Sequence, residues 1–263
     1  MRRDCRVRRI RVRMDRMTDT DKSIAAYDDL ARVCAYDADM DIMHPNRHRM
    51  AEVIVEVLAA GEHTPSAVLD LGTGTGFLLQ RLLSRCPGVR AVALDGARAM
   101  LDLARARLGR AAERVDFRVG DFRSLADLCR GAGPFDAVVS SFALHHLPPE
   151  DKRRLVRTAF AMLNPGGWFL DADIIRAESD YLEELTQRMR VRGIVERAAG
   201  RDQRFADQAS THAFLQAMEE KEGDQPQGLA SDLEALTSAG LEYVTVFWRE
   251  TREVVIGGIK TRG

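Results

Sequence analysis

The sequence lacks the features that would assign it to a membrane-embedded or disulfide-stabilised class. None of its apolar runs approaches the roughly 20 residues that a membrane-spanning helix needs, and no secretory signal peptide is recognisable. The chain has only 4 cysteines in 263 residues, and no two of them form a C-x-x-C pair. We therefore expect reduced thiols in a cytoplasmic protein, with neither a disulfide framework nor a metal site.

An excess of charge of one sign is also missing from the chain as a whole. The 39 basic and 40 acidic residues leave a net charge of −1, which argues against nucleic acid as a partner. The exception is residues 1–17, where eight arginines face only Asp4 and Asp15. We interpret this stretch as a disordered basic leader, or as the result of a start codon upstream of Met14 or Met17. The alternative is an arm for RNA or anionic lipid, but it has no aromatic residue to stack on bases.

Glycine is concentrated at one informative point. The apolar run 68–71 meets three alternate glycines, Gly72, Gly74 and Gly76, and a helical pattern follows at once. Glycines let a backbone turn sharply and let a ligand lie against its N–H groups. A dinucleotide-binding loop would read G-x-G-x-x-G, but Phe77 stands where its third glycine would fall, and no lysine completes a Walker-type loop. The pattern favours a nucleoside-like ligand without phosphates.

Further landmarks follow at the ends of predicted strands. The range 90–94 is predicted as a second strand, and it ends at Asp95, 19 residues beyond Gly76. A carboxylate in that place can accept hydrogen bonds from both ribose hydroxyls of a nucleoside. A third strand, 115–119, leads into the sequence Gly-Asp-Phe at 120–122. Each feature has a purely structural alternative: the glycines as a tight turn, Asp95 as a helix cap, and 120–122 as an ordinary loop.

Two more segments complete an ordered set. A fourth predicted strand, 135–140, leads into 141–148, which contains His145 and His146, and the range 163–170 supplies a turn and a fifth strand. In this order the chain, from about residue 20 to 263, resembles the class I S-adenosylmethionine-dependent methyltransferases. Residues 68–79 are similar to their motif I, and 141–148 to motif IV of the small-molecule type.

The resemblance implies S-adenosylmethionine as cofactor, with S-adenosylhomocysteine as product. It implies that Asp121 accepts a hydrogen bond from the exocyclic amine of adenine and that Phe122 packs near the ring. The cofactor-binding residues expected on this basis are Tyr36, Asp70, Gly72, Thr73, Gly74, Gly76, Asp95, Gly96, Met100, Gly120, Asp121, Phe122, Ser140 and Phe142. No metal ligand is expected among them.

The alternation of strands and helices predicts an α/β fold. We expect a doubly wound, Rossmann-like, mostly parallel seven-stranded sheet whose last strand is antiparallel, closed by a hairpin of 241–248 and 253–259. Helices are expected at 75–86, 97–109, 124–130 and 150–162. Residues 18–263 are predicted as a single methyltransferase domain, in which 18–62 form an N-terminal helical cap and 176–228 a helical lid insertion.

The cap and the last helix allow finer predictions. Helices are expected at 21–33 and 46–60, joined by a non-helical link over 35–40 and a break at His44-Pro45. Within the lid, helices are expected at 178–198 and 202–222. Ser231 and Glu234 have the spacing of a capping box, which predicts the start of a short helix that ends at Gly240.

The catalytic candidates are His145 and His146, because motif IV meets the cofactor site. Either histidine could accept a proton from a hydroxyl or ammonium acceptor, and the alternative is a histidine that anchors the loop. Tyr27 and Tyr36 could contact the ligand or simply pack. Six of the seven arginines in the lid are candidates for a substrate clamp, but they lie among an excess of acidic residues and the sequence singles out none of them: Arg188, Arg190, Arg192, Arg197, Arg201 and Arg204.

Three function classes stay open. We favour a methyltransferase that acts on O, N or C of a small molecule. The sequence leaves the oligomeric state open, with a homodimer as one alternative. The second class is a tRNA-modifying methyltransferase of the wobble-uridine type, some of which use a carboxylated cofactor. The third is a non-catalytic relative that only binds the nucleoside. Salt-sensitive RNA binding would favour the second class, and cofactor binding without turnover would favour the third.

Overall fold

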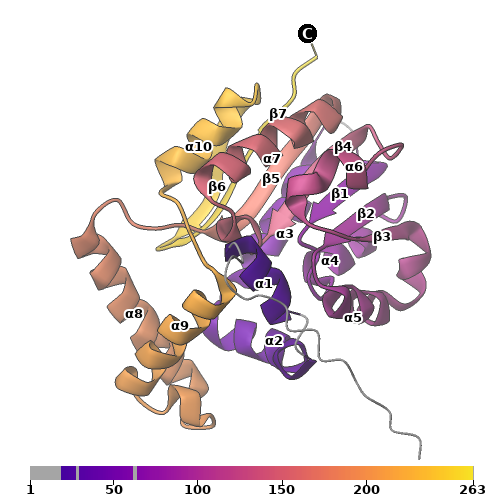
Figure 1. Cartoon of the computed structure of the whole chain (residues 1–263). Helices are drawn as coiled ribbons and strands as arrows, with labels where there is room; N and C mark the ends of the chain where they lie inside the picture. The colour runs from indigo at the N-terminus through magenta and orange to yellow at the C-terminus, as the bar shows by residue number, and fades with distance from the viewer. Residues whose placement is uncertain (1–18, 28–29, 62–63, 263) are drawn as a thin grey trace, which may run out of the picture.

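The computed structural model describes residues 19–27, 30–61 and 64–262, and Figure 1 shows their arrangement. The basic leader expected at 1–17 lies outside the described residues. Among the residues that are described, no helix has both the length and the apolar character needed to cross a membrane.

A single seven-stranded sheet forms the centre of the molecule, in the order β3-β2-β1-β4-β5-β7-β6. The neighbouring strands from β3 to β5 are all parallel, whereas β7 is antiparallel to both β5 and β6. The predicted doubly wound sheet with an antiparallel last strand is therefore confirmed. The strands are β1 (Ala67–Leu71), β2 (Arg90–Asp95), β3 (Val115–Val119), β4 (Phe135–Ser141), β5 (Leu163–Ile174), β6 (Glu242–Glu250) and β7 (Glu253–Ile259).

Helices cover both faces of the sheet (Figure 1). Successive side chains of a strand point to opposite faces, so Val68 packs with α3 and α4, whereas Leu69 packs with α6, α7 and α10. The helices after β1 are close to the predicted ranges. The helices on the sheet are α3 (Arg47–Ala60), α4 (Phe77–Arg85), α5 (Arg98–Leu108), α6 (Leu125–Leu128), α7 (Pro149–Met162) and α10 (Leu229–Ser238).

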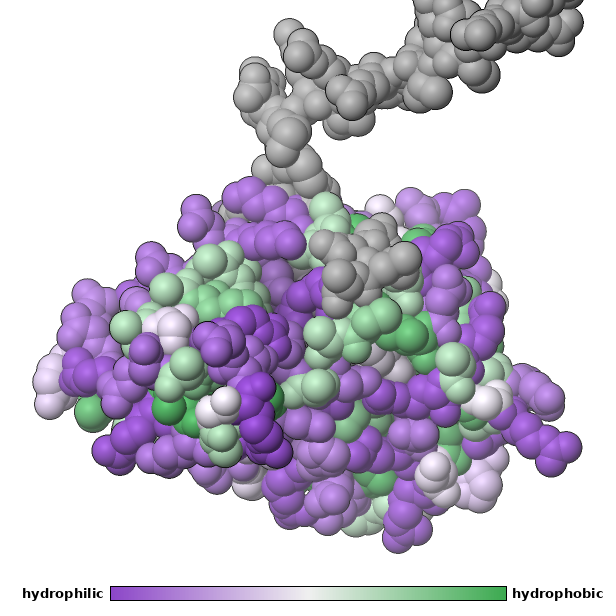
Figure 2. All heavy atoms as spheres, turned by 90° about the horizontal axis from the view of Figure 1, so that it is seen from below, coloured by the Kyte–Doolittle hydropathy of each residue, from purple (hydrophilic) through white to green (hydrophobic). Residues whose placement is uncertain are grey.

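Four helices gather at the carboxyl ends of the parallel strands. They are α1 (Asp19–Tyr27), α2 (Leu30–Met43), α8 (Asp180–Ala198) and α9 (Gln208–Glu222). Helices α8 and α9 extend to one side of the sheet in Figure 1 and meet α2 and α1. A small separate core, which includes Ile194, Phe205 and Leu215, joins α8 and α9. Hydrophilic side chains predominate on the lower face of the molecule, with hydrophobic ones in smaller patches (Figure 2).

Two local predictions were wrong. The expected non-helical link at 35–40 is part of α2, because Val33, Met40 and Met43 recur at helical spacing and are all buried. Helix α2 does end at the predicted His44-Pro45 break. The expected capping box at Ser231 is absent: α10 begins at Leu229 after Gly228 and has no side-chain cap. Its buried Asp232 instead forms an ion pair with Lys152, 2.9 Å apart.

Candidate active site

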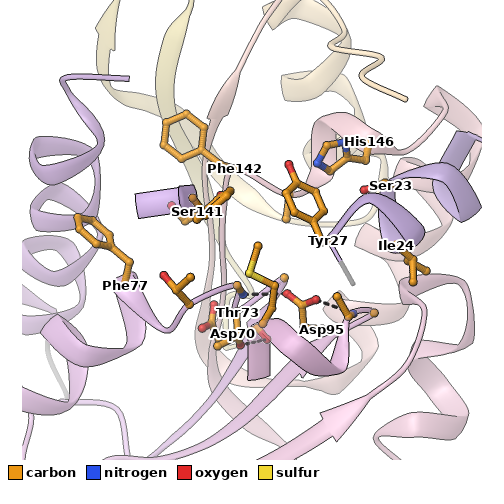
Figure 3. Close-up of a pocket in the computed structure, with 18 of the residues that line it drawn as sticks. Ser23, Ile24, Tyr27, Asp70, Thr73, Phe77, Asp95, Ser141, Phe142 and His146 are labelled. Atoms are coloured by element: carbon orange, nitrogen blue, oxygen red, sulfur yellow. Dashed lines mark hydrogen bonds between the residues drawn. The ribbon is translucent and has the colours of Figure 1, made fainter. Parts of the chain in front are cut away.

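A deep pocket lies over the carboxyl ends of β1, β2 and β4, under α1 and α2 (Figure 3). Its open volume is about 900 Å³. Twelve of the fourteen predicted cofactor residues line it, which brings together segments far apart in the sequence. These twelve are Tyr36, Asp70, Gly72, Thr73, Gly74, Asp95, Gly96, Met100, Gly120, Asp121, Phe122 and Phe142.

The glycine turn after β1 forms the floor of the pocket. Gly72 has a φ of +69°, and a Cβ at this position would overlap the Cβ of Ala143. Its backbone N–H donates to the carbonyl oxygen of Leu94, 2.8 Å away, which fixes the turn to β2. Gly74 has a φ of +53°, and a Cβ there would meet nothing nearer than 3.9 Å. The open side of Gly74 therefore leaves room for a ligand to lie against the backbone.

Gly76 is one of the two predicted residues outside the pocket. It has a φ of +77°, and a Cβ would lie 3.1 Å from both Cα and Cβ of Ala104. This glycine therefore allows the start of α4 to approach α5. It has the packing role that the third glycine of a dinucleotide-binding loop would have.

Ser140 is the other predicted residue outside the pocket. Its side chain is fully buried in β4, and its Oγ has no hydrogen-bond partner among the described residues. Its neighbour Ser141 lines the pocket instead (Figure 3). Because strand side chains alternate, a shift of one residue along β4 exchanges a buried position for a pocket position.

Asp95 connects the glycine turn to the next helix (Figure 3). Its Oδ2 accepts a hydrogen bond from Gly74 N–H and its Oδ1 accepts one from Ala97 N–H, both at 2.8 Å. The structural and functional interpretations of Asp95 are thus compatible, since an ionised carboxylate has about four acceptor positions.

Asp70 lies beneath the turn and is fully buried. Burial raises the pKa of Asp70 to about 7, and the negative charge of Asp95 acts in the same direction. Its Oδ2 has no hydrogen-bond partner among the described residues. An unpartnered buried carboxyl oxygen is costly unless a ligand donates to it, and a cationic donor would also favour the ionised form.

Asp121 and Phe122 lie at the end of β3, on the pocket wall. The carboxylate of Asp121 already accepts hydrogen bonds from the backbone N–H and the Nε–H of Arg123, both at 2.8 Å. Phe122 packs against the turn, with its Cζ 3.1 Å from the place of a Cβ on Gly72. The pair therefore has an acidic and an aromatic group on the same wall, as expected for an adenine site.

The sequence did not indicate the link between the cap and the glycine turn. Asp37 of α2 accepts hydrogen bonds from Arg47 Nη2, at 2.8 Å, and from Thr75 Oγ1, at 3.0 Å, and it also pairs with Arg107. Burial alone would raise the pKa of Asp37, but these hydrogen bonds and charges lower it. Arg47 lines the pocket, and its Nε has no hydrogen-bond partner among the described residues, although Asp41 lies 3.3 Å away.

Both candidate histidines are buried and lie against carboxylates. His145 Nδ1 is 2.5 Å from Asp173 Oδ1, and its backbone N–H donates to the other oxygen of Asp173. Burial lowers the pKa of His145, but the charges of Asp173 and Asp224 outweigh it and raise the pKa to about 9. His146 Nδ1 lies 3.1 Å from Asp224 Oδ1, and its ring meets Tyr27 edge-on at 5.9 Å.

Only His146 lines the main pocket, whereas His145 lines a second, smaller pocket. The second pocket has an open volume of about 350 Å³ and extends under α8 and α9. Four residues line both pockets, which are therefore adjacent: Tyr27, Tyr36, Met40 and Phe142. The hydroxyl of Tyr27 donates to Glu222 of α9 at 2.7 Å, which joins α1 to α9 at the boundary between the two pockets.

Fold and site together define a Rossmann-like α/β domain with its ligand pocket at the carboxyl edge of a parallel sheet. Residues 68–167 match the family described as "Methyltransferase domain". This stretch is therefore similar to methyltransferase domains, and the sheet around it has the Rossmann-like strand order given above.

Two curated relatives illustrate the match. The chain is 33% identical over 129 residues to the biotin biosynthesis bifunctional protein BioHC of Teredinibacter turnerae, covering 46% of this chain and 22% of that protein. It is 31% identical over 147 residues to the demethylmenaquinone methyltransferase of Thermotoga maritima, covering 56% of each. The chain thus spans about a fifth of the first relative and little more than half of the second.

Solved structures extend the likeness to most of the chain. An O-methyltransferase family protein from Burkholderia thailandensis has a TM-score of 0.64 at 19% identity, covering 89% of this chain and 61% of that one. Human N-acetylserotonin methyltransferase in complex with S-adenosylmethionine has a TM-score of 0.60 at 17% identity, covering 94% and 61%. At these identities the likeness establishes the fold.

Proposed function

We propose that the protein is an S-adenosylmethionine-dependent methyltransferase that methylates an O, N or C nucleophile of a small molecule and releases S-adenosylhomocysteine. The observation that carries this proposal is that two pockets lie next to each other and share four lining residues. The larger one contains the glycine turn and Asp95, and the smaller one contains His145 and Asp224. A cofactor in the first pocket would present its reactive end to an acceptor in the second.

The residues of the first pocket fit the cofactor group by group. Asp95 would bind the ribose hydroxyls through its carboxylate, and the open side of Gly74 would accommodate the ligand against the turn. Asp70 has an unpartnered carboxyl oxygen that suits the ammonium of the methionine moiety, and Arg47 lines the pocket with a guanidinium that suits its carboxylate.

S-adenosylmethionine supplies a methyl group that is already activated on a sulfonium sulfur. The protein then has to align the acceptor for in-line displacement and exclude water. Tyr27, Tyr36 and Phe142 line the junction between the pockets and are placed to do both. Tyr27 is fixed through Glu222, so its ring offers a rigid wall rather than a mobile side chain.

We assign proton transfer to His146. With a proton on Nδ1 facing Asp224, the Nε2 of His146 would be an acceptor for a proton from the substrate. His145 has a different part in this scheme. Its pKa of about 9 keeps it protonated at neutral pH, so it would balance the charges of Asp173 and Asp224 rather than act as a base.

The charge of the acceptor side supports a small-molecule substrate over tRNA. The second pocket is bordered by Glu222 and Asp224. Residues 18–263 carry 31 basic and 38 acidic residues. This net negative charge would repel the phosphate backbone of RNA. The described cysteines, Cys34, Cys86 and Cys129, are free thiols, which supports a cytoplasmic setting.

The test combines binding with turnover. Calorimetry with S-adenosylmethionine and with S-adenosylhomocysteine should give saturable one-site binding. A methyl-labelled cofactor should then transfer label to a component of a small-molecule extract but not to tRNA. No binding of either nucleoside would overturn the proposal, and label in tRNA would transfer the assignment to the RNA-modifying class. Binding without label transfer to any acceptor would favour the non-catalytic class.

A further inference from the structure

Two buried arginines lie within 4 Å of the same carboxylate, and one of them lines the second pocket. Arg190 comes from α8 and lines that pocket, and Arg252 comes from the turn between β6 and β7. The side chain of each is only 8% exposed. Arginine is rarely buried without full pairing, so a close pair of them requires an explanation.

The pair shares a single carboxylate. Glu219 of α9 has its Oε1 2.5 Å from Arg190 Nη1, whereas Arg252 Nη1 is 3.9 Å from the same oxygen. The second distance is too long for a hydrogen bond. Burial lowers the pKa of Arg252, and the positive charge of Arg190 lowers it further, which indicates that the two guanidinium groups act on each other.

Three N–H groups of the pair are left without an acceptor. Among the described residues, Arg190 Nε, Arg252 Nε and Arg252 Nη1 have no hydrogen-bond partner. Other carboxylates are near, but none of those described accepts a hydrogen bond from these three N–H groups. Glu253 accepts from His44 and Asn46, and Glu183 from the backbone of Ala177 and from Gln187. Asp224 faces the two histidines.

We propose that Arg190 and Arg252 form an anion-binding site on the acceptor side, and that the methyl acceptor carries a carboxylate which these two side chains bind. This inference rests on the proposed function. One carboxylate can accept two parallel N–H bonds from a guanidinium, which suits the N–H groups of this pair that have no acceptor. Such a contact orients the acceptor, and the atom that receives the methyl group lies elsewhere in the molecule, toward Tyr27 and His146.

The test compares matched acids and amides on the protein saturated with S-adenosylhomocysteine. Benzoate and benzamide have the same shape and differ in charge, and inorganic phosphate tests a different anion. We expect benzoate to bind at low-millimolar concentration, at least about tenfold more tightly than benzamide, and phosphate to bind more weakly than benzoate. Equal affinities, or no binding of benzoate, would overturn the inference, and preference for phosphate would overturn its carboxylate part.

Variants distinguish this site from a structural ion pair. Arg190→Gln and Arg252→Met should each abolish the preference for the acid and leave the affinity for S-adenosylhomocysteine unchanged. Arg192→Gln is the matched control, because Arg192 is exposed on the same helix, and it should keep the preference. A preference that survives in both variants would contradict the proposal.

Thermal unfolding of the free protein gives an independent readout. If Arg252 serves ligand binding, it does not stabilise the ligand-free protein. Arg252→Met should therefore leave Tm unchanged or raise it. A fall of several degrees would show that Arg252 is structural. If that variant fails to fold, Arg252→Lys is the alternative, because lysine keeps the positive charge but cannot donate two parallel hydrogen bonds. It should weaken benzoate binding and leave Tm unchanged. Failure of the wild type to bind S-adenosylhomocysteine would contradict the proposed function alone, since acid and amide can still be compared on the free protein.

Discussion

Asp95 at the end of β2 and Gly74 in the turn after β1 are joined by a hydrogen bond of 2.8 Å. A residue predicted to bind ribose thus also holds the backbone on which the ligand would lie. This dual role shapes what a substitution does, because removing the carboxylate loosens the turn as well as removing two ligand acceptors.

The first prediction concerns that carboxylate. Asp95→Ala should weaken S-adenosylhomocysteine binding by on the order of 2–4 kcal/mol, since two charge-assisted hydrogen bonds are lost. Asp95→Asn retains one acceptor and should lose less. Asp102→Asn, at an exposed position of α5, is the matched control and should bind normally. Calorimetry gives the affinities, and circular dichroism checks the fold. Wild-type affinity in the alanine variant would remove Asp95 from the cofactor site.

The second prediction concerns the glycine turn. Gly72→Ala combines a φ of +69° with overlap against Ala143, and we expect it to destabilise the fold by about 2–4 kcal/mol. Gly88→Ala is the control, because a Cβ there meets nothing within 4 Å. For a domain of this size the first change should lower Tm by roughly 5–15 °C. Similar Tm values for the two variants would contradict the geometry of the turn.

The sequence predicted the parts of the fold that depend on local pattern. Runs such as 68–71 and the glycines after them determine a strand and a turn within a few residues, and the parallel order then places Asp95 and Asp121 at one edge of the sheet. It could not predict partners that meet only through tertiary packing. Asp173 faces His145 across two elements, and Arg190 reaches Glu219 between two lid helices. Asp173 still had a visible signal, since it follows a predicted strand at the same edge.

The third prediction concerns pH. The pKa of His145 is raised to about 9 in the folded protein from an ordinary 6.5, mainly by Asp173 and Asp224 against the opposing effect of burial. The protonated form is therefore favoured by folding. Its contribution should be fully present below pH 6.5 and should be lost as the pH rises through about 9, by up to about 3 kcal/mol.

Denaturant unfolding between pH 6 and 9.5 would measure this loss. His145→Gln should be less stable than the wild type at pH 6 and should show a flatter dependence over the same range. Stability of the wild-type protein that rises from pH 7 to 9 would contradict a protonated His145 beside Asp173.

The last prediction concerns the ion pair that takes the place of the expected capping box. Lys152 of α7 and Asp232 of α10 lie 2.9 Å apart, and each side chain is 4% exposed. Removing one partner leaves an uncompensated buried charge, so Lys152→Met should destabilise the fold by about 3–5 kcal/mol. Replacing both, as Lys152→Met with Asp232→Leu, should recover most of that loss, because two apolar side chains need no partner. Ser231→Ala should be nearly neutral, since Ser231 makes no cap. Urea unfolding of the wild type and these three variants measures the differences. A large loss at Ser231, or a double variant no better than Lys152→Met, would show that packing rather than charge joins α7 to α10.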